Sequence, residues 1–421
     1  MGLKHKTTSG KPRLLIVLNR FVIGGQAVDT IPLAYSLAAD FEILILYGEK
    51  EADEIEPTFL LAANPGLQLK KISHLRRSIN PLIDAIAFHR LLYTFLKYKP
   101  HIVHTHGAKS GFLGRLAAWL CNVPVIIHTF HGHFFHSYFS KYVSNLISGV
   151  ERTIGKITTA AIALSETQKE ELTHKFKIMP ASKIAIIPLG FAFDNNQSAD
   201  SLRFSFRNKY GLKEEDVAIG IVGRIVPVKN HVFFVHVVKN ILEAQNKKAA
   251  FFIVGDGELR TNIEGEFSKH GISYNNTSIT ATNRVVFTSW ITNMYEVMNG
   301  LDIIALTSLN EGTPLSIIEA QFFRKTVVST NVGGVKDTME DRKTGFLVEE
   351  GNLHSFCNNL ELLVNNRDLR LQMGEAGNQF ATERFAKNNE VANTRNFYFS
   401  LLHRKGHAFS NNGPNPYSIS K

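Results

Sequence analysis

Cysteine, long apolar stretches and, in one region, acidic side chains are scarce in this sequence. Two cysteines among 421 residues exclude a disulfide framework and a zinc ribbon, and they fit a reducing compartment. The most apolar stretch, residues 111–127, is interrupted by Arg115, Asn122 and Pro124, so no membrane span is expected. Residues 1–13 are polar and basic, which is not the pattern of a signal peptide. We therefore expect a cytoplasmic protein.

Acidic residues are almost missing from residues 57–150, where ten Lys and Arg side chains accompany only Asp84. The whole chain has a formal charge of +10, but residues 201–421 are nearly balanced, with 25 basic and 22 acidic side chains. The excess of cations therefore lies in the first half and indicates an anionic partner. A nucleic acid is disfavoured as that partner, because no helix-turn-helix, zinc or RNA-binding signature occurs.

What the sequence does contain is an alternation of short apolar runs with helical patterns. The runs are rich in β-branched residues and continuously apolar, which is typical of parallel strands covered on both faces. Strand, helix and strand in this repetition predict doubly wound α/β sheets. The expected strands are 13–19, 41–47, 67–72, 102–105, 123–129, 160–164, 184–188, 218–222, 250–254, 284–288, 303–307 and 326–329.

These repeats are too many for one compact sheet, so we expect two domains. A polar stretch at residues 194–200 separates them, which places an N-terminal domain at 1–195 and a second domain at 205–385. After residue 385 a helical pattern at 387–403 has no strand behind it, and residues 405–421 are expected to be disordered. Two such Rossmann-like domains would face each other across a cleft, with ligands outside the carboxyl ends of the strands.

Two loops that follow expected strands suit phosphate groups. After the first strand, Gly24 and Gly25 precede a helix and allow close approach to its free amides, although a plain turn is equally favoured. After strand 218–222, Gly223 is followed by Arg224 and Lys229. A guanidinium and an ammonium together suit a diphosphate, and two solvated surface cations are the alternative.

A third loop, after strand 303–307, combines a helix start with two carboxylates. Thr313 is expected to cap a helix whose first residue is Pro314, so that backbone amides point at an anion. Glu311 precedes this helix and Glu319 lies within it among apolar neighbours. Carboxylates only accept hydrogen bonds and therefore match hydroxyls rather than phosphate. Amides, cations and carboxylates together predict a site for a nucleotide sugar.

A fourth loop is rich in histidine, with His128, His131, His133 and His136 inside residues 127–136. Metal binding is disfavoured, because the spacing is not helical and no cysteine or acidic residue accompanies them. We expect one of them to face the cleft as a hydrogen-bond partner and the others to be structural. The pair formed by His104 and His106 is left undecided.

The motifs of the second half resemble those of the retaining glycosyltransferases of family 4, which have the GT-B fold. Gly223-Arg224 with Lys229 is followed by Glu311-Gly312, Pro314 and Glu319-Ala320 in matching order and spacing. The turn 254–257 and the segments 330–334 and 344–348 also fit. Residues 130–133 and 151–165 are similar to a branch that makes bacterial surface polysaccharides, including lipopolysaccharide.

The resemblance implies a role for each matching residue. Arg224 and Lys229 would neutralise the donor diphosphate in place of a metal, so no metal or other cofactor is expected. Glu311 would contact hydroxyls of the donor sugar, His131 would lie beside that sugar, and Glu319 would accept from the ribose.

The remaining matching positions are implied to bind the donor through the backbone or the base. The sugar and distal phosphate would be held by the amides of Gly312, Thr313, Pro314 and Leu315. Gly24 and Gly25 would approach the diphosphate and the acceptor, and Trp290 and Ile291 would contact the base. The helix at 387–403 would return to the first domain.

We therefore expect transfer of a sugar, with retention, from a nucleoside-diphosphate sugar to an acceptor hydroxyl. The resemblance implies a UDP-sugar, and a sugar-nucleotide epimerase of the same overall fold is the alternative. The basic and aromatic pattern at 86–99 suits the inner face of an anionic membrane and a lipid-linked or glycan acceptor. A core helix with a solvated cationic rim explains the pattern nearly as well.

Overall fold

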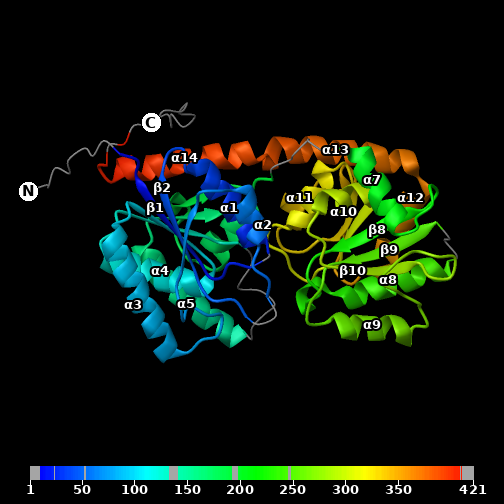
Figure 1. Cartoon of the computed structure of the whole chain (residues 1–421), viewed down its shortest axis with the longest axis horizontal. Helices are drawn as coiled ribbons and strands as arrows, with labels where there is room; N and C mark the ends of the chain where they lie inside the picture. Colours follow the sequence, from blue (N-terminus) through cyan, green and yellow to red (C-terminus); the bar gives the residue numbers. More distant parts are fainter. Residues whose placement is uncertain are drawn as a thin grey trace, which may run out of the picture. The chain divides into compact units, whose positions relative to one another are not determined.

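The computed structural model describes residues 10–22, 24–51, 54–131, 141–191, 198–244, 248–407 and 409, without the side chains of 141–143. The chain divides into two units (Figure 1). Unit 1 comprises Met1–Gly190 and Lys387–Lys421, and unit 2 comprises Phe191–Ala386. The domain boundary predicted at 195 falls among residues 192–197, which lie outside the described part.

The described part of unit 1 holds a seven-stranded parallel sheet in the order β3-β2-β1-β4-β5-β6-β7. Its strands are β1 (Arg13–Leu18), β2 (Glu42–Tyr47), β3 (Gln68–Lys71), β4 (Ile102–His106), β5 (Val125–Thr129), β6 (Ala160–Ala163) and β7 (Ile184–Ile186). Its helices are α1 (Gly25–Leu37), α2 (Thr58–Ala63), α3 (Pro81–Tyr98), α4 (Ala108–Leu120), α5 (Lys141–Ile157), α6 (Glu166–Glu170) and α14 (Lys387–Arg404).

The described part of unit 2 holds a six-stranded parallel sheet in the order β10-β9-β8-β11-β12-β13. Its strands are β8 (Val217–Val222), β9 (Ala249–Val254), β10 (Val285–Ser289), β11 (Ile303–Leu306), β12 (Thr326–Thr330) and β13 (Gly345–Val348). Its helices are α7 (Ala199–Lys209), α8 (His231–Glu243), α9 (Arg260–Lys269), α10 (Met294–Gly300), α11 (Leu315–Phe322), α12 (Leu353–Asn365) and α13 (Arg367–Phe385).

The predicted fold class of two doubly wound, Rossmann-like domains is confirmed. All twelve expected strands are present, and their bounds differ from the expected ones by at most two residues. The edge strand β13 was not predicted, because its four residues begin with a glycine and are too short to give a pattern. Among the described residues, no helix combines the length and apolar composition that crossing a bilayer requires.

Burial on both faces explains why the strands are continuously apolar. In β1, Leu14 and Ile16 belong to one core cluster, which includes residues of α1 and α14. Leu15 and Val17 point to the opposite face and belong to a second cluster, which includes residues of α3 and α4. Because neighbouring side chains of a strand face opposite sides, covering both faces of a strand favours apolar residues at successive positions.

Helix α14 is held in unit 1 by apolar packing and by buried charges. Tyr398 and Phe399 pack against Phe41, with ring centroids 5.6 and 5.1 Å apart. The Lys387 ammonium lies 3.0 Å from a carboxylate oxygen of Asp29 on α1 and 2.5 Å from one of Glu390. Burial alone would lower the pKa of Lys387, but the two carboxylates raise it above its ordinary value. Burial and the Asp29 carboxylate raise the pKa of Glu390 well above its usual range.

The expected helix at 387–403 is therefore an element of unit 1, although the chain reaches it from α13 of unit 2. Residues 405–407 of the tail that was expected to be disordered continue from α14, and the ring of His407 lies 5.9 Å from that of His101. Residues 408 and 410–421 lie outside the described part.

Replacing Lys387 by methionine should destabilise unit 1 by about 3–5 kcal/mol at pH 8, because two buried carboxylates lose their cation. The loss should be smaller at pH 5, where the Glu390 carboxyl, whose pKa is raised, can bind a proton. Urea unfolding, followed by Trp119 fluorescence in a Trp290→Phe background, measures both values. The exposed Lys405→Met is the control, and an equal loss in both variants would contradict the assignment.

Candidate functional site

The order of strands in unit 2 opens a crevice at one place. Connections from β8 run outward through β9 and β10 on one side, and those from β11 run outward through β12 and β13 on the other. At such a switch point the loops at the carboxyl ends of the two central strands separate and leave room for a ligand. The predicted donor loops follow β8 and β11 and therefore lie at this point.

An ion pair joins these two loops. The Lys229 ammonium lies 2.7 Å from Oε1 of Glu311, and the same oxygen accepts a hydrogen bond of 2.6 Å from the Ser308 hydroxyl. Both charged side chains are mostly buried, with exposed fractions of 20% for Lys229 and 12% for Glu311. The structure thus brings together two of the predicted catalytic residues from loops 82 residues apart.

Backbone contacts fix the two loops to each other. The Leu309 amide donates to the Val228 carbonyl at 2.8 Å, and the Thr307 hydroxyl donates to the Lys229 carbonyl at 3.0 Å. The loop after β12 closes over them, where the Gly334 amide donates to the Glu311 carbonyl at 3.0 Å. A Cβ on Gly334 would lie 1.9 Å from the Gly312 carbonyl oxygen, so only glycine permits this approach.

Helix α11 begins one residue later than predicted. Pro314, with φ −70° and ψ 105°, is the N-cap rather than the first helical residue, and no side chain caps the helix. Thr313 is therefore not the cap, because the extended backbone at Pro314 delays the first helical turn. The first amides of α11 therefore have no side-chain partner.

Glu319 lies in the second turn of α11 and is half-buried. Burial raises the pKa of its carboxyl above the ordinary value to about 7. No described residue donates a hydrogen bond to this carboxylate or pairs with it. The side chain is thus a partly shielded acceptor whose ionised form lacks stabilisation from the protein.

The other predicted donor-binding residues of unit 2 are not part of the Lys229–Glu311 contact. Gly223 has φ +146° and follows β8, and the backbone of the 254–257 turn passes beside it. Arg224 is half-buried, and no described carboxylate forms an ion pair with it. Trp290 is 40% exposed just beyond β10, whereas Ile291 packs partly against the core.

Some residues of this site were missed in the sequence. Ser308 orients Glu311, and Arg260 pairs with Asp256 at 2.7 Å and also contacts Ser289, directly before Trp290. His231 is buried at the start of α8, and burial together with the Lys229 charge lowers its pKa to about 4. Ser308 could have been recognised as a site residue because it follows an expected strand. Arg260 lies at the start of a helix, and the sequence contains no pattern that marks it.

In unit 1, the half-buried His131 contacts a cluster of buried histidines. A hydrogen bond of 2.6 Å joins His131 Nε2 to Nδ1 of His106, the last residue of β4. The ring of His106 lies 4.1 Å from that of His104. His104 in turn bonds the Tyr398 hydroxyl of α14 at 2.6 Å and the Thr129 hydroxyl at 2.7 Å.

Burial keeps this cluster neutral. It lowers the pKa of His104 to about 3 and also depresses the pKa values of His106, His128 and His131. The Asp29 carboxylate acts against this shift at His131 without reversing it. These imidazoles therefore offer hydrogen bonds rather than positive charge at neutral pH.

The remaining predicted site residues of the first domain are either exposed to solvent or lie outside the described residues. Gly24 is the N-cap of α1 in an extended conformation, and a Cβ there would meet no atom within 4 Å. Gly25 is the first helical residue, and both are exposed. His133 and His136 lie outside the described residues. Across the described ranges, no group of three His, Cys, Asp or Glu side chains is arranged to hold a metal ion.

Comparison with known proteins gives matches for both units. Residues 23–194 match the family "Glycosyltransferase Family 4" and residues 203–380 match "Glycosyl transferases group 1". The chain is 30% identical to an Escherichia coli UDP-Gal:alpha-D-GlcNAc-diphosphoundecaprenol alpha-1,3-galactosyltransferase, over 72% of this chain and 76% of that protein. It is 25% identical to a capsular polysaccharide biosynthesis glycosyltransferase of Staphylococcus aureus, over 77% and 85% of the two chains.

The fold is also similar to that of solved structures. The Anabaena protein HepE, crystallised with UDP and glucose, has a TM-score of 0.77 at 16% identity, covering 92% of this chain and all of that one. Sucrose-phosphate synthase from Thermosynechococcus elongatus has a TM-score of 0.78 at 17% identity, covering 94% and 100% of the two chains.

Replacing Glu319 by glutamine should stabilise unit 2 by up to about 3 kcal/mol at pH 8.5 and by less than about 1 kcal/mol at pH 5. A carboxyl whose folded pKa is raised prefers the protonated form, so the wild type loses stability as pH rises towards 7, and the glutamine variant does not. Urea unfolding, followed by Trp290 fluorescence in a Trp119→Phe background, measures the difference. The exposed Glu350→Gln should show none, and a pH-independent effect of Glu319→Gln would refute the assignment.

Proposed function

The chain belongs to the glycosyltransferases, and from this we propose that it transfers a sugar from a UDP-sugar to an acceptor hydroxyl with retention of the anomeric configuration. The proposal rests above all on the Lys229–Glu311 pair at the switch point of unit 2. A cation and a carboxylate side by side suit the two parts of such a donor, its diphosphate and its sugar hydroxyls.

Donor binding would rearrange this pair. A diphosphate competes with Glu311 for the Lys229 ammonium, and a released Glu311 can then accept hydrogen bonds from sugar hydroxyls. Arg224 has no carboxylate partner among the described residues and would add a second cation. Glu319 would accept from the ribose, and such hydroxyl donors would stabilise its ionised form and lower its raised pKa.

The chemistry needs stabilisation of the leaving group. The bond between the anomeric carbon and the diphosphate breaks, and negative charge develops on the phosphate oxygens. The acceptor oxygen bonds to the anomeric carbon, and its proton passes to the departing diphosphate. Lys229 (once released from Glu311), Arg224 and the amides at the start of α11 are donors that can carry this charge without a metal ion. The neutral His131 would offer the donor sugar a hydrogen bond.

The acceptor is proposed from the relatives. The Escherichia coli relative is named for transfer of galactose from UDP-Gal to GlcNAc on diphosphoundecaprenol, and the Staphylococcus aureus relative is named for capsular polysaccharide biosynthesis. We infer a lipid-linked sugar as acceptor and surface polysaccharide synthesis, in the cytoplasm at the inner face of the membrane, as the process. The epimerase alternative gains no support from these relatives, which are named as transferases.

Calorimetric titration should give binding of one nucleotide sugar in the presence of EDTA. UDP-galactose is the first donor to test, followed by UDP-glucose, UDP-N-acetylglucosamine and GDP-mannose. Glu319→Ala should weaken binding of that donor about tenfold or more, since a hydrogen bond to a charged group is worth about 1.5–3 kcal/mol. Glu350→Ala serves as the control. Binding only after addition of a divalent cation would contradict metal independence, and binding of GDP but not UDP would contradict the base.

Lys229→Ala should lower turnover by about 10²–10³, by analogy with the loss of one oxyanion-hole donor. Transfer of labelled galactose to a synthetic lipid-diphosphate GlcNAc measures the rate, and the anomeric coupling of the product reads its configuration. The exposed Lys343→Ala should retain full activity. An inverted product, or equal rates for both variants, would refute the proposed role.

A further inference from the structure

Unit 1 has a groove that the proposed donor chemistry does not use. It measures about 400 Å³ and lies between the edge strand β3 and helix α3. This volume is within the range of small-ligand sites. The residues that line it are Lys70, Lys71, Ile72, Ser73, Ile86, His89, Arg90, Tyr93 and Thr94.

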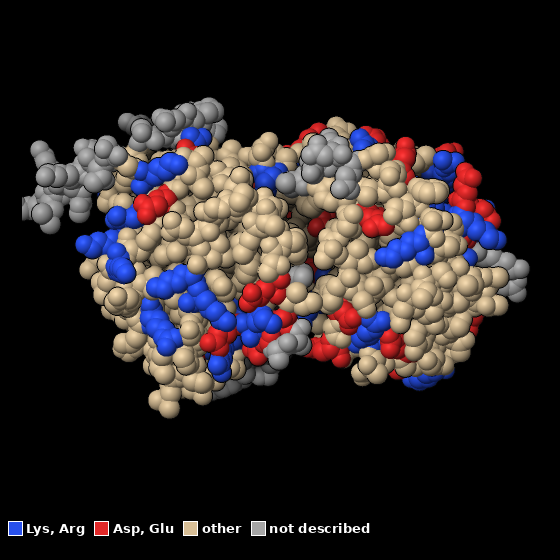
Figure 2. Space-filling model, in the orientation of Figure 1, with Lys and Arg blue, Asp and Glu red and all other residues tan. Residues whose placement is uncertain are grey.

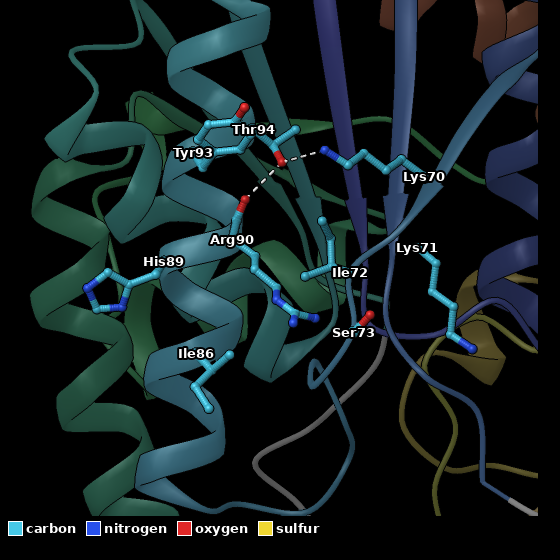
Figure 3. A pocket seen from close by; sticks show the side chains of 9 residues that line it. All are labelled: Lys70, Lys71, Ile72, Ser73, Ile86, His89, Arg90, Tyr93 and Thr94. Carbon is cyan, nitrogen blue, oxygen red and sulfur yellow. Dashed lines mark hydrogen bonds between the residues drawn. The ribbon is translucent and has the colours of Figure 1, made fainter.

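The groove is cationic. In Figure 3 the Lys70 ammonium points toward α3 and donates to the Thr94 hydroxyl at 3.0 Å, while the Arg90 guanidinium reaches toward Ser73. Lys71 follows on the strand, and its ammonium points away from α3 (Figure 3). None of the lining residues is acidic.

Two carboxylates near this region are paired with cations outside the groove, and Glu49 also interacts with Lys71. Glu49 pairs with Arg76 at 2.6 Å, and Asp84 pairs with Lys109. Figure 2 shows Lys and Arg side chains on the part of unit 1 where Figure 1 draws α3. An anion in the groove would therefore meet a net positive surface.

Helix α3 also exposes an apolar stripe beside the groove. Leu82 is 80% exposed, Tyr93 65% and Leu96 62%. With Ile86 and His89 they follow spacings of four, three, four and three residues, which places all five on one face of the helix. The core-facing residues Ala87, Leu91, Thr94 and Phe95 occupy the opposite face.

This arrangement favours one of the two interpretations of the sequence. A core helix with a cationic rim explains the buried face, but it leaves large apolar side chains in water. Apolar side chains flanked by cations suit the boundary between headgroups and acyl chains of a bilayer. A nucleic acid would match the cations but would give the aliphatic Leu82 and Leu96 no apolar medium.

We propose that the β3–α3 groove and the apolar stripe form a docking site for an anionic phospholipid membrane. Lys70 and Arg90 bind a lipid phosphate in the groove, and Leu82, Tyr93 and Leu96 enter the acyl boundary. The inference deepens the proposed function, because a lipid-linked acceptor lies in such a membrane. Docking itself requires no donor, so it can be tested separately.

The test is flotation of the full chain with vesicles of phosphatidylcholine alone or with 30% phosphatidylglycerol. The wild type should float only with the anionic vesicles and should be released when salt rises from 0.1 to 0.5 M. Lys70→Gln/Arg90→Gln should partition about 30-fold more weakly, and Leu82→Gln/Leu96→Gln about tenfold more weakly. The exposed pair Arg342→Gln/Lys343→Gln of unit 2 removes the same charge as the first variant and should bind as the wild type does.

Three results would overturn the docking proposal. Equal flotation with phosphatidylcholine vesicles would show that binding needs no anionic surface. Equal weakening by the unit 2 control would show that the charges of the groove have no special role. Binding of inorganic phosphate or of a 20-nucleotide RNA that depends on Lys70 and Arg90, without flotation, would assign the groove to another anion. Thermal unfolding and UDP binding should be the same in all variants as in the wild type. If the wild type itself does not bind UDP, the donor proposal is refuted and the docking proposal is not.

Discussion

The reversal of strand order in each parallel sheet is the constraint on which the rest of the structure depends. Chain connections that move outward from two central strands leave the loops at their carboxyl ends uncovered. In unit 2 these are the loops after β8 and β11. A hydrogen bond between their backbones joins the two loops independently of their side chains. In unit 1 the same position lies at the ends of β1 and β4, where Gly24 and His106 are found. The candidate site residues gather at these points because the remaining parts of the sheets are covered by helices.

The two units stabilise their buried polar side chains in different ways. Unit 2 keeps charges at its site, and the Lys229–Glu311 pair is stabilised by Ser308 and by close glycine packing. Unit 1 keeps its histidines neutral, because burial depresses their pKa values, and it joins them through hydrogen bonds that extend to Tyr398. This last contact connects the histidine cluster to α14, which also supplies Lys387 to the buried carboxylates of Asp29 and Glu390. The return of the chain to unit 1 is thus part of the architecture of its polar core.

Helix α3 shows how one element can serve two environments. Its inner face completes the core on one side of the sheet, and its outer face carries leucine and tyrosine side chains that the protein itself does not cover. Surface helices usually place polar residues on that face. The cations of α3 and β3 lie beside the stripe, so charge and apolar surface occur together. An anionic membrane surface offers partners for both.

The sequence by itself determined the strands, the helix at 387–403 and the loops that carry Lys229, Glu311 and Glu319. It could do so because continuous apolar runs and the residues that follow them are local signals, which a buried parallel strand imposes on the chain. Only the tertiary structure decided which side chains meet. Lys229 and Glu311 are 82 residues apart, and His104 and Tyr398 are 294 apart, so no local pattern records their contact. The start of α11 and the strand β13 also depend on neighbouring loops and strands. The sequence also left open whether the apolar residues of α3 are buried. An apolar residue in a helix gives the same sequence pattern whether the fold buries it or leaves it in solvent.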